Sequence, residues 1–115
     1  MTHEMKLKKA PFEMIKSGQK IYELRLYDEK RRSISPFDEI IFTLDGNESE
    51  KLRCTVKELC VFPSFKELYL SLPLLECGYT SQTVKSASYL DMERYYSADE
   101  QKEFKVVGIK IELIK

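Results

Sequence analysis

Three charged side chains stand close together in an apolar stretch near the N-terminus. They are Lys20, Glu23 and Arg25, in the segment SGQKIYELRLY at residues 17–27. A lysine can neutralise a phosphate or polarise a carbonyl group. A carboxylate can accept a hydrogen bond from the exocyclic amine of a base, and a guanidinium can clamp a phosphate or stack on a base. These charges therefore form either a solvated strand face or one wall of a binding cleft, and we favour the cleft.

The positions of these residues along a strand decide which of them can meet. The alternation of Ile, Tyr and Leu over residues 20–28 predicts a strand. Glu23 and Arg25 have the same parity and share one face, while the main core takes the opposite parity, which comprises Tyr22, Leu24 and Leu26. Lys20 also has this opposite parity. It can join the pair only if it precedes the regular pleat or if the strand twists strongly, and both alternatives stay open.

Two further groups of side chains could contact a nucleic acid. The basic segment EKRR directly follows the strand, and its cations could touch phosphates beside the cleft or form a solvated loop: Lys30, Arg31 and Arg32. Four tyrosines gather in the second half of the chain, where they could stack on bases or complete a small core: Tyr79, Tyr89, Tyr95 and Tyr96.

The elements that must position these residues follow from hydrophobic periodicity and turn signals. Pro11 suits the first position of a helix over residues 10–18, and Gly18 suits its C-terminal cap. Ser64 and Glu67 have the spacing of a capping box, so a helix is expected from Ser64 to about Leu72. A change of parity within residues 51–62 predicts a β-bulge near residues 57–58. Strands are predicted over residues 3–8, 20–28, 38–44, 51–62 and 104–115, with a broken helical segment over 81–96.

This order of elements favours an α+β fold in a single domain over residues 1–115. The strands lack a βαβ rhythm, so we expect a small mixed or antiparallel sheet that curls toward a barrel, with short helices on one side. Apolar residues make up 43% of the 115-residue chain, which is enough for a hydrophobic core. No apolar run is long enough to cross a membrane and no signal peptide is apparent, so a cytoplasmic location is expected.

The charge and the metal-ligating residues of the chain limit which partners it can have. The net charge is zero, but residues 1–35 hold nine Lys and Arg against five Asp and Glu, so any contact with nucleic acid must be local. The three cysteines lack a metal-binding spacing and His3 is the only histidine, so neither a metal nor a cofactor is expected. The cysteines are interpreted as small buried hydrophobic residues. The sequence makes no prediction of oligomeric state, exact ligand or pathway.

The segment GQKIYELR at residues 18–25 resembles the Gly-x-Lys-x-x-Glu-x-Arg motif of ASCH domains, which are relatives of the PUA domain. The resemblance extends to PFEMIKSG, PFDEIIF, FPSFKEL and the final VVGIKIELI. It implies a PUA-like β-barrel with a cleft for RNA or a nucleoside, bound by Gly18, Lys20, Glu23 and Arg25. Some relatives hydrolyse the amide of acetylated cytidine, whereas others are thought to bind RNA or, in at least one case, to cut it.

The same resemblance bears on catalysis. In the amidohydrolase relatives, catalysis is implied for a lysine after Gly-x, a threonine three residues later and a distant glutamate. Lys20 matches the lysine, Glu23 occupies the threonine position, and Glu76 falls near the distant glutamate. A Lys20–Glu76 or Lys20–Glu23 pair could still activate a water. Because Glu23 has no hydroxyl, we favour a module that binds RNA or a modified nucleoside; the alternatives are a small hydrolase, a ribonuclease, and a regulatory domain that binds another anion.

Overall fold

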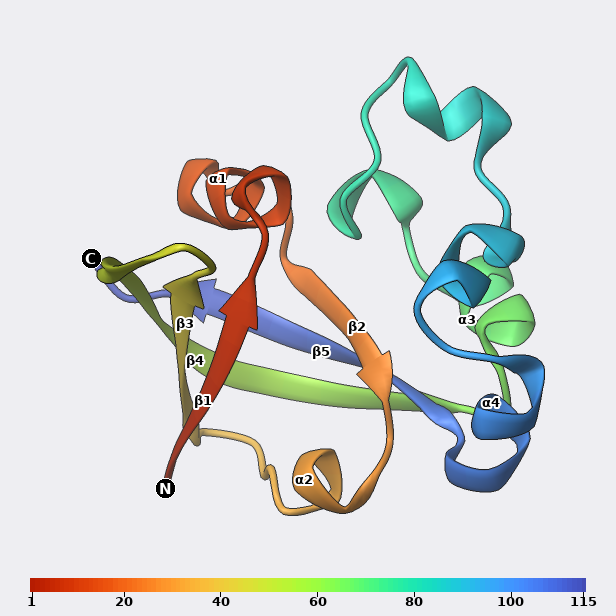
Figure 1. Ribbon diagram of the computed structural model, residues 1–115, viewed down its shortest axis with the longest axis horizontal. Coiled ribbons are helices and arrows are strands. Elements are labelled where there is room, and N and C mark those ends of the chain that lie inside the picture. Colours follow the sequence, from red (N-terminus) through yellow and green to blue (C-terminus); the bar gives the residue numbers. More distant parts are fainter.

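The structure is a computed structural model that describes all 115 residues, built on one curled sheet of five strands (Figure 1). The strand order is β1-β3-β4-β5-β2. β1 and β3 are parallel, and all other neighbours are antiparallel, so the sheet is mixed as predicted. The bounds are β1 Thr2–Leu7, β2 Tyr22–Leu26, β3 Glu39–Leu44, β4 Asn47–Phe62 and β5 Val106–Leu113.

The long strand β4 gives the sheet its curl. Its first half pairs with β3 and its second half with β5, so one strand belongs to both sides of a half-barrel. The register shifts between Val56 and Glu58, which leaves Lys57 as the extra residue of a β-bulge. This confirms the bulge predicted from the change of parity. Bulges bend a strand and increase its twist, which brings the edge strands β1 and β2 toward each other.

The helix α1 (Lys9–Ser17) links these two edge strands. It ends as predicted at Gly18, which adopts the left-handed conformation with φ of 88° and donates its N–H to the carbonyl of Ile15 at 3.0 Å. The helix begins two residues before Pro11 rather than at it. Proline is tolerated there because the first four N–H groups of a helix have no intrahelical acceptor. Phe12 and Ile15 are buried against the inner face of the sheet.

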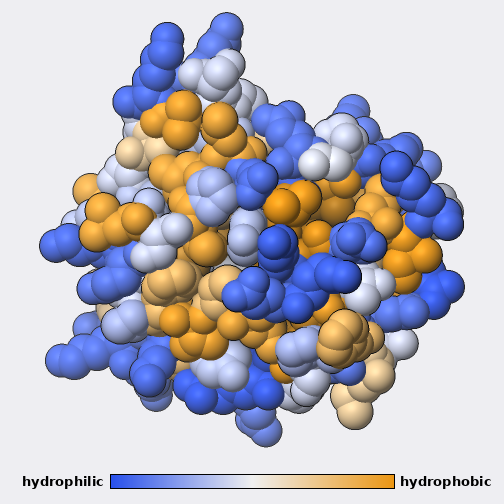
Figure 2. Space-filling model, turned by 180° about the vertical axis from the view of Figure 1, so that it is seen from behind, coloured by the Kyte–Doolittle hydropathy of each residue, from blue (hydrophilic) through white to orange (hydrophobic).

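The segment between β4 and β5 packs on the outer face of the sheet. It holds the helices α3 (Phe65–Ser71) and α4 (Ala98–Phe104) and three 3₁₀ turns, η1 Leu74–Glu76, η2 Thr83–Ser86 and η3 Tyr89–Arg94. Seen from behind, the molecule carries several apolar groups among hydrophilic ones (Figure 2). The segment contributes four exposed apolar side chains: Leu70, Leu75, Leu90 and Tyr95.

Two apolar clusters therefore lie on opposite faces of the sheet. The inner cluster joins β1, β3, β4 and β5 to α1, and the outer one joins β2 to α3. The expectation that all helices lie on one side was wrong, because α1 packs in the inner cluster and α3 packs in the outer one. The outer cluster also takes the β2 residues assigned to the main core, which are buried as predicted but on the other face: Tyr22, Leu24 and Leu26.

The serines at the starts of α3 and α4 act differently as caps. α3 begins after Ser64 as expected, but the Ser64 hydroxyl donates to the Glu67 carboxylate and does not cap the backbone. At α4, Ser97 and Glu100 form the complete reciprocal capping box. The segment EKRR is also not an open loop, because it forms the single-turn helix α2 (Glu29–Arg32), which Asp28 caps at 3.2 Å from the Arg31 amide. No helix of the structure combines the length and apolar character needed to span a bilayer.

Candidate functional site

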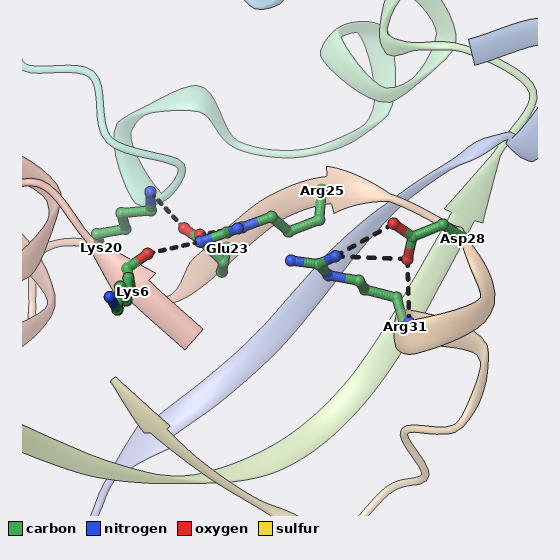
Figure 3. A network of polar contacts seen from close by, with 6 residues as sticks. All are labelled: Lys6, Lys20, Glu23, Arg25, Asp28 and Arg31. Carbon is green, nitrogen blue, oxygen red and sulfur yellow. Dashed lines mark hydrogen bonds and ion pairs between the residues drawn. The ribbon is translucent and has the colours of Figure 1, made fainter. Parts of the chain in front are cut away.

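Lys20, Glu23 and Arg25 converge on one another in the interior of the protein (Figure 3). Lys20 Nζ lies 2.8 Å from one carboxylate oxygen of Glu23, and Arg25 Nε donates to the other oxygen at 2.7 Å. The exposed fraction of Glu23 is 4% and that of Lys20 is 8%, so these charges do not form a solvated strand face. We call these three residues the charged triad.

The backbone shows how Lys20 reaches residues of opposite parity. β2 begins only at Tyr22, so Lys20 precedes the regular pleat. Its N–H donates to the carbonyl of Met14 at 3.0 Å, as the chain leaves α1, and Ile21 donates to the carbonyl of Glu76 at 2.9 Å. The first of the two alternatives left open by the sequence is therefore correct. Glu23 and Arg25 share one face of β2 as predicted.

Glu23 remains ionised despite its burial. Burial alone raises the pKa of the Glu23 carboxyl, but the charges and hydrogen bonds of Lys20 and Arg25 outweigh it, and the net pKa lies below the usual range. Both carboxylate oxygens accept a hydrogen bond from a cation. Such a carboxylate serves as a fixed negative centre that positions the two cations, and it is a poor proton acceptor at neutral pH.

Arg25 also joins the two edges of the sheet. β1 pairs only with β3 and β2 only with β5, so no backbone ladder connects β1 to β2. Arg25 Nη2 donates to the main-chain carbonyl of Lys6 in β1 at 3.1 Å, across this seam (Figure 3). A side chain that is itself held by Glu23 therefore bridges the open side of the half-barrel.

A pocket of about 650 Å³ opens over the charged triad. Its walls are β1 and the start of α1, β2, and the segment from Cys77 to Tyr96. Basic side chains outnumber acidic ones by five to two: Lys6, Lys8, Lys20, Arg25 and Arg94 against Glu23 and Asp91. Lys6 and Lys8 pair with exposed carboxylates outside the pocket, and exposed pairs of this kind are weak. The lining of the pocket therefore carries a surplus of positive charge.

Tyrosines form the wall opposite the charged triad. The hydroxyls of Tyr69 and Tyr79 lie 2.7 Å apart, and Tyr79 donates to Asp91 at 2.7 Å, which lowers the pKa of Asp91. Tyr96 stacks on Phe65 with ring centroids 5.9 Å apart. These rings have structural partners, whereas Tyr95 lines the pocket with 69% of its surface exposed. The structural interpretation therefore holds for Tyr79 and Tyr96, whereas base stacking stays a prediction for Tyr95.

Three other lining residues were not singled out from the sequence. Gly78 has φ of 115°, and a Cβ built there would lie 3.6 Å from the Lys20 side chain. Cys77 is buried beside it, and burial raises the pKa of its thiol to about 12. Tyr69 lies in α3, where it packs against the outer cluster and also lines the pocket. Of these signals, only the glycine in the polar segment ECGYTSQ could have been recognised as a turn.

The remaining candidates lie outside this pocket. The side chain of Glu76 is not part of the lining, although its main-chain carbonyl holds Ile21 in place. In α2, Arg31 pairs with Asp28 at 3.2 Å. Arg32 lies 4.5 Å above the ring of Tyr27 and donates to the carbonyl of Phe104. Lys30 is exposed without an ion pair. Tyr89 packs in the outer cluster.

The charged triad makes a prediction about stability. Replacing Glu23 by Gln leaves Lys20 and Arg25 buried without their counter-ion, so the free energy of unfolding at pH 6 should fall by about 3–5 kcal/mol. Because the folded pKa of Glu23 lies below its unfolded value, its stabilising contribution is present above the unfolded pKa and is lost as the pH falls through the folded pKa.

The measurement is urea unfolding of wild type and Glu23→Gln at pH 6 and pH 3. The difference in unfolding free energy between the two proteins should be smaller at pH 3. The matched control is Glu13→Gln on the exposed face of α1, which should change stability by less than about 0.5 kcal/mol at either pH. Equal stability of wild type and Glu23→Gln at pH 6 would contradict the role given to the triad.

Comparison with known proteins identifies the family. The family model described as ASCH domain matches residues 5–115. A crystal structure titled hypothetical protein PH0355 aligns with a TM-score of 0.82 and 37% identity, over 99% of this chain and 100% of that chain. The solution NMR structure of protein PF0455 from Pyrococcus furiosus aligns with a TM-score of 0.73 and 32% identity, over 100% of this chain and 99% of that one. No curated protein matches. The half-barrel is a PUA-like fold, and the chain belongs to the ASCH domain family.

Proposed function

We propose that this ASCH domain binds RNA or a modified nucleoside by holding one nucleotide unit in the pocket over the charged triad. The observation that carries the proposal is the combination of a positive floor with an exposed aromatic ring in one pocket of about 650 Å³. Pockets that hold small ligands typically measure about 300–1,000 Å³. The membership of the chain in a family proposed to bind RNA supports the same function.

The aromatic wall suits a base. Proteins recognise unpaired bases by stacking them on aromatic side chains and by hydrogen bonds to their polar edges. Tyr95 offers an exposed ring at the pocket, and its neighbour Tyr96 is fixed against Phe65, with the two tyrosine rings 6.4 Å apart. A base could therefore stack on Tyr95 without displacing a side chain from the outer cluster.

The floor offers donors and an acceptor that the triad leaves free. An ammonium has three N–H donors and a guanidinium has five, so Lys20 and Arg25 both retain donors after binding Glu23. Each carboxylate oxygen of Glu23 has a second lone pair, which can accept from an exocyclic amine. We assign Lys20 and Arg25 to a phosphate or base carbonyl, Glu23 to a base amine, and Gly18 to the turn that carries Lys20 into place.

Two finer parts of the proposal rest on residues that mostly lie outside the pocket. Lys30, Arg31 and Arg32 remain proposed phosphate contacts for an RNA that extends past the pocket along α2; of these, Lys30 is exposed and unpaired.

The three cysteines carry free thiols, which supports a reducing compartment, and we propose the cytoplasm.

A hydrolase acting on an acylated cytidine-type nucleoside is the second candidate. The observation in its favour is the contact of 2.8 Å between Lys20 and Glu23 at the floor of the pocket, where a substrate carbonyl could be polarised by the ammonium. Two observations count against it. Glu23 is ionised and accepts a hydrogen bond from a cation on each oxygen, and Glu76 lies outside the pocket. A ribonuclease would face the same lack of a free general base. Binding is therefore the function that the geometry supports best.

Stacking on Tyr95 can be tested by removing the ring. Tyr95→Ala should weaken binding of 5′-mononucleotides by about 1–3 kcal/mol, since that is the usual effect of losing one stacked base contact. Isothermal titration calorimetry gives the affinities. Phe37→Ala is the matched control, because Phe37 is 80% exposed but does not line the pocket, and its affinities should equal those of wild type. Equal weakening by both substitutions would count against stacking at Tyr95.

The two candidate functions differ in their outcome with N4-acetylcytidine. We expect this nucleoside to raise the melting temperature of the domain without being consumed, as followed by liquid chromatography over hours, because ligands that bind only the folded state stabilise it. Release of acetate that is abolished by Lys20→Ala would establish the hydrolase and refute a purely binding role. Neither stabilisation nor turnover with any nucleoside or nucleotide would reject both functions.

A further inference from the structure

A second groove adjoins the nucleotide pocket at Lys20. It has a volume of about 600 Å³ and lies between the C-terminal end of α1, the bulge of β4 and the end of β5. Lys20 lines both the groove and the pocket, so the two hollows meet at this side chain. The Gly18 turn, which carries the chain from α1 into β2, forms part of the groove wall.

Lysines from separate parts of the chain surround this groove. Besides Lys20, its lining holds Lys16 at the end of α1, Lys57 in the bulge, Lys110 in β5 and Lys115. Lys20 is neutralised by Glu23, and only Glu58 and Glu112 oppose the other four lysines, which leaves a surplus of two positive charges. We call Lys16, Lys57, Lys110 and Lys115 the lysine groove residues.

None of the lysine groove residues forms an ion pair, although the structure holds eight salt bridges elsewhere. Their side chains are therefore available to an external anion. Clefts lined by one sign of charge concentrate ligands of the opposite sign. In a protein with no net charge, a local surplus of this kind can attract a polyanion.

The bulge in β4 contributes directly to this arrangement. In a regular strand, Lys57 and Glu58 would point to opposite faces. Because the register shifts between Val56 and Glu58, both side chains are exposed and both line the groove. The feature that curls the sheet thus also presents Lys57 at the surface beside Lys110.

We propose that the lysine groove binds the phosphates of an RNA strand that continues from the nucleotide held in the pocket. The inference rests on the proposed function and sharpens it, because it makes the ligand an RNA strand of several nucleotides in preference to a free nucleoside. Lysine ammonium groups contact phosphates as point charges without reading bases, so the groove adds affinity that is independent of sequence.

The test compares short and long ligands on the same variants. Binding of the four 5′-mononucleotides is measured by calorimetry, and binding of a fluorescein-labelled RNA of eight nucleotides with mixed sequence is measured by anisotropy at several salt concentrations. The test variant is Lys16→Ala/Lys57→Ala, which removes two exposed lysines of the groove. The control is Lys66→Ala/Lys102→Ala, which removes two exposed lysines of α3 and α4 that line neither hollow.

The groove variant should bind the RNA more weakly while its affinity for mononucleotides stays that of wild type. The slope of log affinity against log salt should become shallower by about 1.4, since each lost phosphate contact of a single strand contributes about 0.7. The control variant should retain the wild-type slope. Thermal unfolding followed by circular dichroism verifies that both variants are folded, and Lys57→Gln alone should show half the change in slope.

Several results would overturn the inference. If wild type binds mononucleotides but the groove variant keeps the wild-type affinity and slope for the RNA, the groove is not part of the binding surface and the proposed function survives. If wild type binds neither ligand, the proposed function fails together with the inference. Binding of both proteins to vesicles of phosphatidylserine and phosphatidylcholine is measured as well. If the groove variant binds these vesicles more weakly than wild type but binds the RNA equally well, the lysines belong to a membrane-binding surface.

Discussion

The buried carboxylate of Glu23 is the constraint on which the rest of the site depends. Moving an ion from water into a protein interior carries a penalty of several kcal/mol, which is offset only by close, well-directed partners. Lys20 and Arg25 supply them, one on each oxygen, at 2.8 and 2.7 Å. The carboxylate therefore fixes three segments at once: the chain that leaves α1, the strand β2, and, through Arg25 and the Lys6 carbonyl, the edge strand β1.

This arrangement links the fold to the proposed function. Well-packed apolar residues could close the seam between β1 and β2 with equal or greater stability, because a buried ion pair is often no better than a hydrophobic contact of similar volume. In the charged seam, Lys20 and Arg25 line the pocket and keep N–H donors beyond those that bind Glu23. The polar groups that hold the half-barrel together are thus also the groups that a nucleotide would contact, and the tyrosine wall on the outer segment completes the pocket.

Most of the sheet and part of the site could be predicted from the sequence. Alternating apolar residues located every strand, Gly18 marked the end of α1, and the change of parity located the bulge because successive side chains of a regular strand point to opposite faces. The convergence of Lys20 on Glu23 was left open, since parity holds only within the pleat and Lys20 precedes it. Gly78, Tyr69 and the covering of both sheet faces were missed because they depend on long-range packing of residues 63–104, which local patterns do not encode.

A nuclear magnetic resonance titration of the ¹⁵N-labelled domain with 5′-mononucleotides tests the central claim most directly. Binding over the charged triad should shift the amide signals of Lys20, Gly78 and Tyr95 with a single saturable affinity, while signals of the exposed tip at Phe37 stay in place. A Lys20→Met protein that remains folded should lose these shifts. Saturable shifts confined to residues outside the pocket, or shifts that persist unchanged in the Lys20→Met protein, would contradict the account.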